Sequence, residues 1–193
     1  MHPLQAFFQS ISPLQATTWD VLFPLFKPAS LKAGEFFITE HSIAHQIAYL
    51  HTGCARAFFT NAKGKEYNKQ FFVGPSLIGA YTSLLTGQAN RIPQQALTDC
   101  EIWVADFPQI QALYEHHHDL ERLGRKIAEM YFLEKEAKEL EMALEDASQR
   151  YLNFQKRYPT LEQEIPQYHI ASYLSITTTQ LSRIRRKLSQ SPD

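Results

Sequence analysis

Four side chains near the end of the chain have the types and spacing needed to contact a nucleic acid: Thr179, Ser182, Arg183 and Arg186. On a helical wheel of about 100° per residue, all of them fall on the face opposite the apolar Leu181. Arginine pairs bidentately with guanine, while hydroxyl groups bond to bases or to phosphates. This face therefore predicts contacts with the edges of DNA bases.

The flanks of this segment carry further groups suited to DNA. We expect contacts from Thr177, Thr178, Arg185 and Lys187. From residue 166 to the end of the sequence, four basic residues stand against one acidic residue, although the whole chain has a formal charge of −1. No acidic residue lies between Glu164 and Asp193. Positive charge is thus concentrated where a polyanion would bind.

The element that must position these side chains is a helix-turn-helix over residues 167–188. Such a motif needs apolar residues where its two helices meet, a small residue where they cross, and a tight turn. These are supplied by Ile170, Ala171, Leu174, Ile176, Leu181, Ile184 and Leu188. Ser175 lies in the turn. Thr177 and Gln180 predict a capping box at the start of the second helix.

A long helical segment precedes this motif, since residues 113–152 contain one glycine and no proline. Apolar residues recur there at steps of three and four, namely Leu120, Leu123, Ile127 and Met130. We expect residues 108–138 to form a helix that pairs with its twin in a homodimer through this stripe. The alternative is that the stripe packs only on the chain's own β domain. A break near residues 138–140 is expected to start a second helix that ends before Pro159.

Residues 31–107 have the texture of β structure. Runs rich in aromatic and β-branched residues alternate with turn signals such as the one at Gly53 and the one over residues 61–64. The runs are residues 36–38, 47–50, 55–60, 67–73, 94–97 and 102–105. This spacing predicts a sandwich, jelly roll or barrel, so that the whole chain belongs to the α+β class.

These features resemble the Crp/Fnr superfamily of bacterial transcription regulators over residues 10–188. Residues 79–87 are similar to the family's phosphate-binding cassette, and residues 157–174 are similar to members common in Bacteroidetes. The resemblance implies a cyclic-nucleotide-binding-type β-roll, a double-stranded β-helix or jelly roll, over residues 1–107 with its N-terminal helices. It also implies a dimerisation helix over residues 108–138 and a DNA-binding domain over residues 139–193. The implied ligand pocket consists of Gly79, Ala80, Tyr81, Thr82, Ser83, Asn90, Arg91 and Ile92.

Some residues depart from the family pattern. Ala80 stands where cyclic-AMP-binding members have a glutamate for the ribose, and Asn90 and Arg91 stand where they have Arg-Ser for the phosphate. Because an unpaired ribose hydroxyl costs about 1–3 kcal/mol, we expect cyclic AMP to bind weakly or not at all. An unknown small-molecule effector is compatible with the pattern. Ser175 replaces the usual turn glycine, and the five residues after Leu188 are too few for the usual β-hairpin wing.

Other kinds of chemistry find little support. Three consecutive histidines, residues 116–118, point in three directions from a helix and cannot chelate one metal ion together. No catalytic residue and no cofactor is expected, and Cys54 and Cys100 are expected to be reduced core thiols. The sequence contains no span for a membrane and no basic leader, so a cytoplasmic location is expected.

The expected partners are double-stranded DNA, a second copy of the chain and, by resemblance, RNA polymerase. One alternative function remains open: a ligand-binding or interaction module with a β-roll and a decayed DNA-binding domain. A cupin-type metal enzyme is a weaker alternative, because no His-x-His occurs in the β region.

Overall fold

The computed structural model describes residues 1–190 and divides the chain into two compact units. The first unit contains Met1–Ala57 and Phe71–Glu134, and the second contains Phe58–Gln70 and Lys135–Asp193. No wing is expected after Leu188, and residues 191–193 at the end of that segment lie outside the described residues. Among the described residues, the model contains no helix that is both long and apolar enough to cross a membrane.

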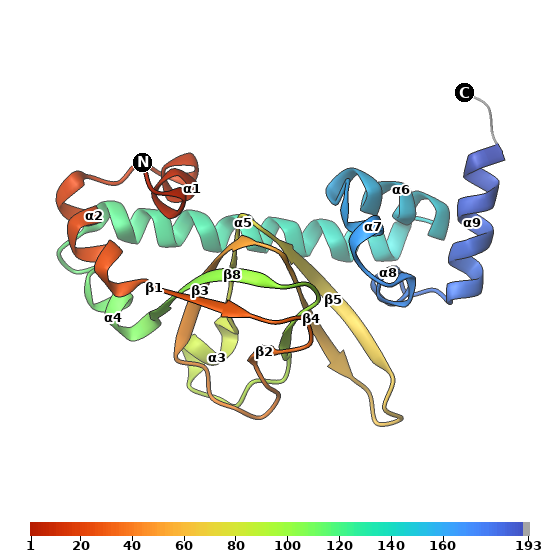
Figure 1. Cartoon of the computed structure of the whole chain (residues 1–193), viewed down its shortest axis with the longest axis horizontal. Helices are drawn as coiled ribbons and strands as arrows, with labels where there is room; N and C mark the ends of the chain where they lie inside the picture. Colours follow the sequence, from red (N-terminus) through yellow and green to blue (C-terminus); the bar gives the residue numbers. More distant parts are fainter. Residues whose placement is uncertain (191–193) are drawn as a thin grey trace. The chain divides into compact units, whose positions relative to one another are not determined.

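The β structure of the first unit is a roll of two antiparallel sheets (Figure 1). One sheet has the order β1-β8-β3-β6, and the other has the order β2-β7-β4-β5. The strands are β1 (Lys27–Leu31), β2 (Phe36–Ile38), β3 (Gln46–Thr52), β4 (Cys54–Thr60), β5 (Glu66–Val73), β6 (Ser76–Ile78), β7 (Gln94–Ala96) and β8 (Cys100–Asp106). All six predicted runs form strands. The sequence reading missed β1 and β6, which are short and lack a strong apolar pattern.

The interior of the roll is apolar and includes Leu50, Ala57, Phe72, Ile78 and Ile102. Both cysteines are free thiols buried in the unit. The predicted turn at Gly53 joins β3 to β4 with a φ of +94°, and a Cβ there would lie 2.4 Å from the carbonyl oxygen of Asp99. This turn therefore requires glycine.

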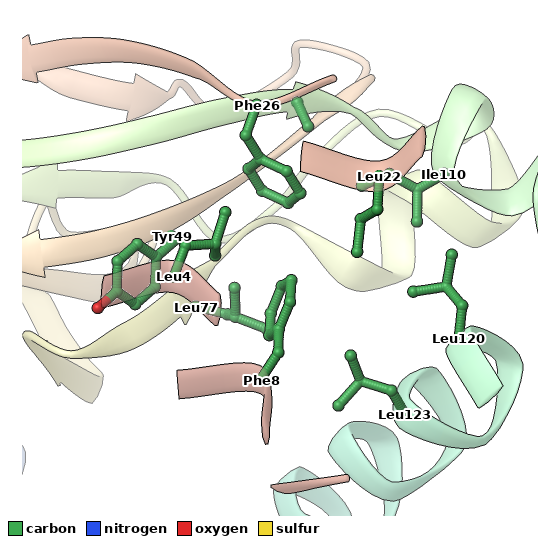
Figure 2. Packing of buried hydrophobic residues seen from close by; sticks show 10 residues of the cluster. Leu4, Phe8, Leu22, Phe26, Tyr49, Leu77, Ile110, Leu120 and Leu123 are labelled. Atoms are coloured by element: carbon green, nitrogen blue, oxygen red, sulfur yellow. The ribbon is translucent and has the colours of Figure 1, made fainter. Parts of the chain in front are cut away.

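A second apolar cluster joins the N-terminal helices to the roll (Figure 2). It is built from α1 (Pro3–Ile11), α2 (Ala16–Leu22), a 3-10 turn η1 (Phe23–Leu25), α4 (Phe107–Ala112), the roll, and the start of α5 (His118–Leu144). Leu120 and Leu123 are only 3% and 1% exposed here, packed with Leu22, Phe8 and Ile110. Leu120 and Leu123 were predicted to be dimer contacts, but the structure places them in the core of the first unit. Ile127 packs against the same cluster, whereas Met130 is exposed.

The helix predicted over residues 108–138 is divided in the structure, because α4 ends at Ala112 and α5 begins only at His118. The predicted break near residues 138–140 is wrong, because α5 continues to Leu144. Residues 138–144 contain only good helix formers and neither glycine nor proline, so nothing in the local sequence ends the helix there. The next helix, α6 (Ala147–Arg157), begins at Asp146, whose carboxylate accepts hydrogen bonds from the backbone N–H groups of Ser148 and Gln149.

The second unit adds three more helices to α6 and to the end of α5: α7 (Leu161–Glu164), α8 (Gln167–Tyr173) and α9 (Thr178–Gln190). Its core contains Phe154, Leu161, Ile170, Leu174 and Leu181, each at most 1% exposed. The far end of the β4–β5 hairpin, Phe58–Gln70, belongs to this unit, although it is distant in sequence from the helices. The sequence reading placed this segment with the β domain, because a contact between distant segments leaves no local pattern.

Candidate nucleic-acid interface

Helices α8 and α9 form the predicted helix-turn-helix. Ile170, Ala171, Leu174 and Leu181 are buried between them, as the apolar pattern predicts. The turn closes through a hydrogen bond of 3.0 Å from the Ile176 N–H to the carbonyl oxygen of Ala171. Ser175 has a φ of +55°, in the left-handed region that glycine adopts most easily. The turn therefore has the conformation typical of the motif, with a serine at its strained position.

The start of α9 is fixed by the predicted capping box. The Gln180 N–H donates to the Thr177 hydroxyl oxygen at 3.1 Å, and the Thr177 N–H donates to the Gln180 side-chain oxygen at 2.9 Å. This reciprocal pair satisfies two N–H groups that a helix start otherwise leaves free. The Thr177 hydroxyl is engaged in the cap, while Thr178 is exposed beside it.

The outward face of α9 carries the four side chains predicted to read DNA. Thr179, Ser182, Arg183 and Arg186 are all exposed. They lie on one face because Leu181 is buried on the opposite side of the helix. This surface offers two exposed guanidinium groups and two hydroxyls to a ligand.

Arg185 lies elsewhere. Its Nε is 3.0 Å from a carboxylate oxygen of Glu162 on α7, and Glu162 also accepts a hydrogen bond of 2.7 Å from the Tyr151 hydroxyl. Burial and the neighbouring Glu162 carboxylate raise the pKa of Tyr151 to about 12. Arg185 therefore ties α9 to α7 and α6 rather than extending freely toward a phosphate. Lys187 is exposed on the same helix.

A buried charge network, which the sequence reading missed, joins α5, α6 and α8. Glu141 is 5% exposed, and its carboxylate lies 3.1 Å from Lys138 Nζ and 3.2 Å from Arg157 Nη2. Arg157 also donates to the Tyr173 hydroxyl at 2.7 Å, and Lys138 Nζ lies 3.9 Å from the centre of the Tyr173 ring. Only the Lys138–Glu141 spacing was visible in the sequence. The network holds the first helix of the motif, α8, against α5 and α6.

The residues of the predicted ligand pocket lie together at β6, β7 and α3 (Tyr81–Thr86), but several are already committed to the fold. Asn90 is buried, and its side chain bonds to the backbone of Thr39 and Ile92 at 3.0–3.1 Å. The Ser83 hydroxyl accepts from the Ala44 N–H and donates to the Gln88 carbonyl oxygen. Gly79 accepts a hydrogen bond from Gln94. These polar groups shape the loop itself.

The remaining pocket residues include one arginine and no carboxylate. Ala80 is buried and has no carboxylate for a ribose hydroxyl. Arg91, Tyr81 and Thr82 are exposed, and Ile92 is half-buried against the roll's apolar interior.

Two residues that sequence reasoning missed lie beside the pocket. Tyr131 of α5 packs against the apolar interior of the roll and donates to the carbonyl oxygen of Leu77 at 2.9 Å. Burial, followed by the charge of Glu134, raises the pKa of Tyr131 to about 12, so its hydroxyl stays a donor. Gln94 is 4% exposed, and its side-chain oxygen has no partner among the described residues.

The structure also brings together Thr18, His117 and Asp119, which resemble a nucleophile with a base. The Thr18 hydroxyl lies 3.0 Å from His117 Nδ1 and donates to Asp119 at 2.9 Å. Thr18 is 1% exposed, and Asp119 also accepts from the Gln15 N–H at 2.8 Å. The group therefore joins α2 to the start of α5 and offers no accessible nucleophile. Among residues 1–190, no cluster of three metal-ligating side chains is found.

The comparisons with known proteins find similarity in structure alone. The chain matches no family model and no curated protein. It superposes on FixK2 from Bradyrhizobium japonicum with a TM-score of 0.72 and 16% identity, over 85% of this chain and 84% of that one. It superposes on the c-di-GMP-responsive global regulator CLP from Xanthomonas campestris with a TM-score of 0.69 and 14% identity, over 91% and 92%.

A third solved structure is a transcriptional regulator of the Crp/Fnr family from Eubacterium rectale. Its TM-score is 0.71 and its identity is 11%, over 91% of this chain and 84% of that one. At these identities the comparison establishes the fold. This chain therefore shares its fold with these solved regulators.

Proposed function

We propose that this chain is a homodimeric, DNA-binding transcription regulator whose recognition helix is α9. The observation that carries the proposal is the exposed face of Thr179, Ser182, Arg183 and Arg186 on a fully formed helix-turn-helix. The capping box fixes the start of α9, and Leu181 fixes its rotation. In a decayed DNA-binding domain, neither this packing nor a face free of acidic residues would be expected to persist.

The dimer proposal rests on the outer face of α5. Exposed apolar residues follow one another there at steps of three, four, three and four: Met130, Leu133, Ala137, Leu140 and Leu144. Met130 and Leu133 are 47% and 61% exposed, and Leu140 and Leu144 are 54% and 79% exposed. This is the heptad pattern of a two-stranded coiled coil, so a second copy of α5 is the proposed occupant. The two recognition helices would then read half-sites about one DNA turn apart.

Cyclic AMP is not the proposed effector. Ala80 supplies no carboxylate, and the Asn90 amide is already saturated by the backbone. Calorimetry with cyclic AMP is expected to show no low-micromolar binding. An effector with a hydrogen-bond donor for the Gln94 oxygen would suit this part of the roll better. RNA polymerase is a proposed partner by fold analogy alone.

Fluorescence anisotropy with DNA from upstream of the protein's own gene tests the function. Arg183→Ala/Arg186→Ala is expected to weaken specific binding by about 100-fold or more, since each arginine–base pair contributes about 1–3 kcal/mol. Arg122→Ala/Arg125→Ala, which removes two exposed arginines of the first unit, is the matched control and should bind like the wild type. Wild-type protein that binds specific and random DNA equally would contradict the proposal.

A further inference from the structure

The far end of the β4–β5 hairpin is fastened to the first helix of the helix-turn-helix. Asn68 on β5 is 5% exposed, and its side-chain amide donates to the carbonyl oxygen of His169 at 2.9 Å and lies 3.2 Å from His169 Nδ1. The Ser172 hydroxyl accepts from the Asn68 N–H and donates to the Glu66 carbonyl oxygen, both at 3.0 Å. The hairpin end and α8 are therefore held as parts of one compact unit.

The turn at the tip of this hairpin is closed by hydrogen bonds of Asn61. The Asn61 side-chain oxygen accepts from the backbone N–H groups of Lys63 at 2.9 Å and Lys65 at 3.0 Å. The Asn61 N–H donates to the Lys65 carbonyl oxygen at 3.0 Å, and Gly64 has a φ of +76°. These bonds close the turn, in which the side chains of Lys63 and Lys65 are exposed.

An aromatic pair stiffens the strands directly behind the turn. The rings of Phe59 and Tyr67 stack across the hairpin with centres 5.4 Å apart and planes 14° apart. Lys65 Nζ lies 4.9 Å from the centre of the Tyr67 ring. Cross-strand aromatic pairs stabilise two-stranded hairpins, and the ring face also orients the ammonium group.

The charge of the tip suits an anion. The hairpin end, residues 58–70, contains the three lysines Lys63, Lys65 and Lys69 against one acidic residue, Glu66. On the same unit, α9 presents Arg183 and Arg186 at the surface, with no acidic residue on that helix. A polyanion held by α9 is therefore the partner whose charge matches the tip. Because the hairpin is already docked on α8, the tip loses less conformational freedom when it binds.

We propose that the β4–β5 hairpin tip is a second DNA contact, in which Lys63 and Lys65 bind backbone phosphates beside the bases read by α9. This inference rests on the proposed function of α9. The contact is to phosphates, so it adds affinity and salt dependence without changing sequence preference. The tip would then contribute to the same complex from a part of the chain more than 100 residues away from α9.

The test compares Lys63→Ala/Lys65→Ala with the wild type in anisotropy titrations at several salt concentrations. Each phosphate contact contributes about 0.9 to the slope of log affinity against log salt. The double variant is expected to lower this slope by about 1.8 and therefore to weaken binding about 60-fold at about 0.1 M salt, equally for specific and random DNA. The conservative Lys63→Arg/Lys65→Arg variant should keep the wild-type slope, which excludes a loss caused by misfolding of the turn.

Matched lysines of the first unit provide the control. Lys27→Ala/Lys32→Ala also removes two exposed lysines and should leave the slope unchanged. If the wild type binds and Arg183→Ala/Arg186→Ala abolishes binding, but Lys63→Ala/Lys65→Ala keeps the full slope, the hairpin proposal is overturned while the function of α9 stands. Wild-type protein without specific binding would instead overturn the proposed function.

Discussion

At the scale of single residues, the site combines free groups with groups that the fold has already used. Arg183 and Arg186 are exposed, whereas Arg185 is paired with Glu162. A basic residue on a recognition helix is therefore not automatically a DNA contact. Its partner within the unit decides whether it binds a phosphate or holds the helix in place.

Ser175 allows a test of backbone strain in the turn. A non-glycine residue in the left-handed region costs about 1–2 kcal/mol, while glycine loses about 0.5–1 kcal/mol more chain entropy on folding. Ser175→Gly is therefore expected to stabilise the protein by about 0.5–1 kcal/mol in urea denaturation. Ser175→Ala keeps the strain and should bring no such gain. A loss of stability in Ser175→Gly would contradict the strain argument.

Glu141 allows a test of the buried charge network. Glu141→Gln leaves Lys138 and Arg157 without their carboxylate and is expected to destabilise the protein by about 2 kcal/mol. This is below the 3–5 kcal/mol typical of a broken buried pair, because Arg157 is 36% exposed. Glu139→Gln, which breaks an exposed pair with Lys135, should cost less than about 0.5 kcal/mol. Equal losses in urea denaturation would show that burial of Glu141 is unimportant.

At the scale of elements, α5 serves two surfaces at once. Its inner face supplies Leu120, Leu123 and Tyr131 to the core of the first unit. Its outer face leaves Leu133 and Leu140 exposed. The helix can close the roll and pair with a second copy because residues three and four apart share a face, so two stripes fit on one helix.

The hairpin end is the second element whose contacts can be tested. Asn68→Ala removes the side-chain donor to His169 in a buried setting and is expected to cost about 1–3 kcal/mol of stability. The variant should also lower the salt slope of DNA binding toward that of Lys63→Ala/Lys65→Ala, because the tip is then held only by the two bonds of Ser172 to the hairpin backbone. The half-buried Asn153 of α6, which bonds to Gln149 and to Glu145, gives a control in Asn153→Ala that should leave the slope unchanged. If Asn68→Ala loses stability but keeps the full salt slope, then docking of the hairpin on α8 is not required for the DNA contact.

At the scale of the whole molecule, the proposed function requires two chains. Leu133→Glu/Leu140→Glu places charges on the outer stripe of α5 and is expected to give monomers in analytical ultracentrifugation. Specific DNA affinity should fall about 100-fold or more, because joining two half-site contacts raises affinity by 10²–10⁴ in typical bivalent systems. Lys135→Ala/Glu139→Ala, on another face of α5, should remain dimeric. A charged double variant that stays dimeric would place the interface elsewhere.

The sequence by itself determined the parts whose signals are local. The apolar spacing of Ile170, Leu174 and Leu181, the capping pair of Thr177 with Gln180, and the six strand runs depend on neighbours within a few residues. For this reason the helix-turn-helix and the outward face of α9 could be predicted from the sequence.

Only the tertiary structure decided which partners meet across long distances. An apolar stripe on a helix has the same periodicity whether it packs in the core or stays exposed. The periodicity therefore could not assign Leu120 and Leu123 to the chain's own β domain. The contact of Asn68 with His169 spans 101 positions, and that of Glu141 with Arg157 spans 16. Such pairs arise from the packing of whole elements, and no local pattern records them.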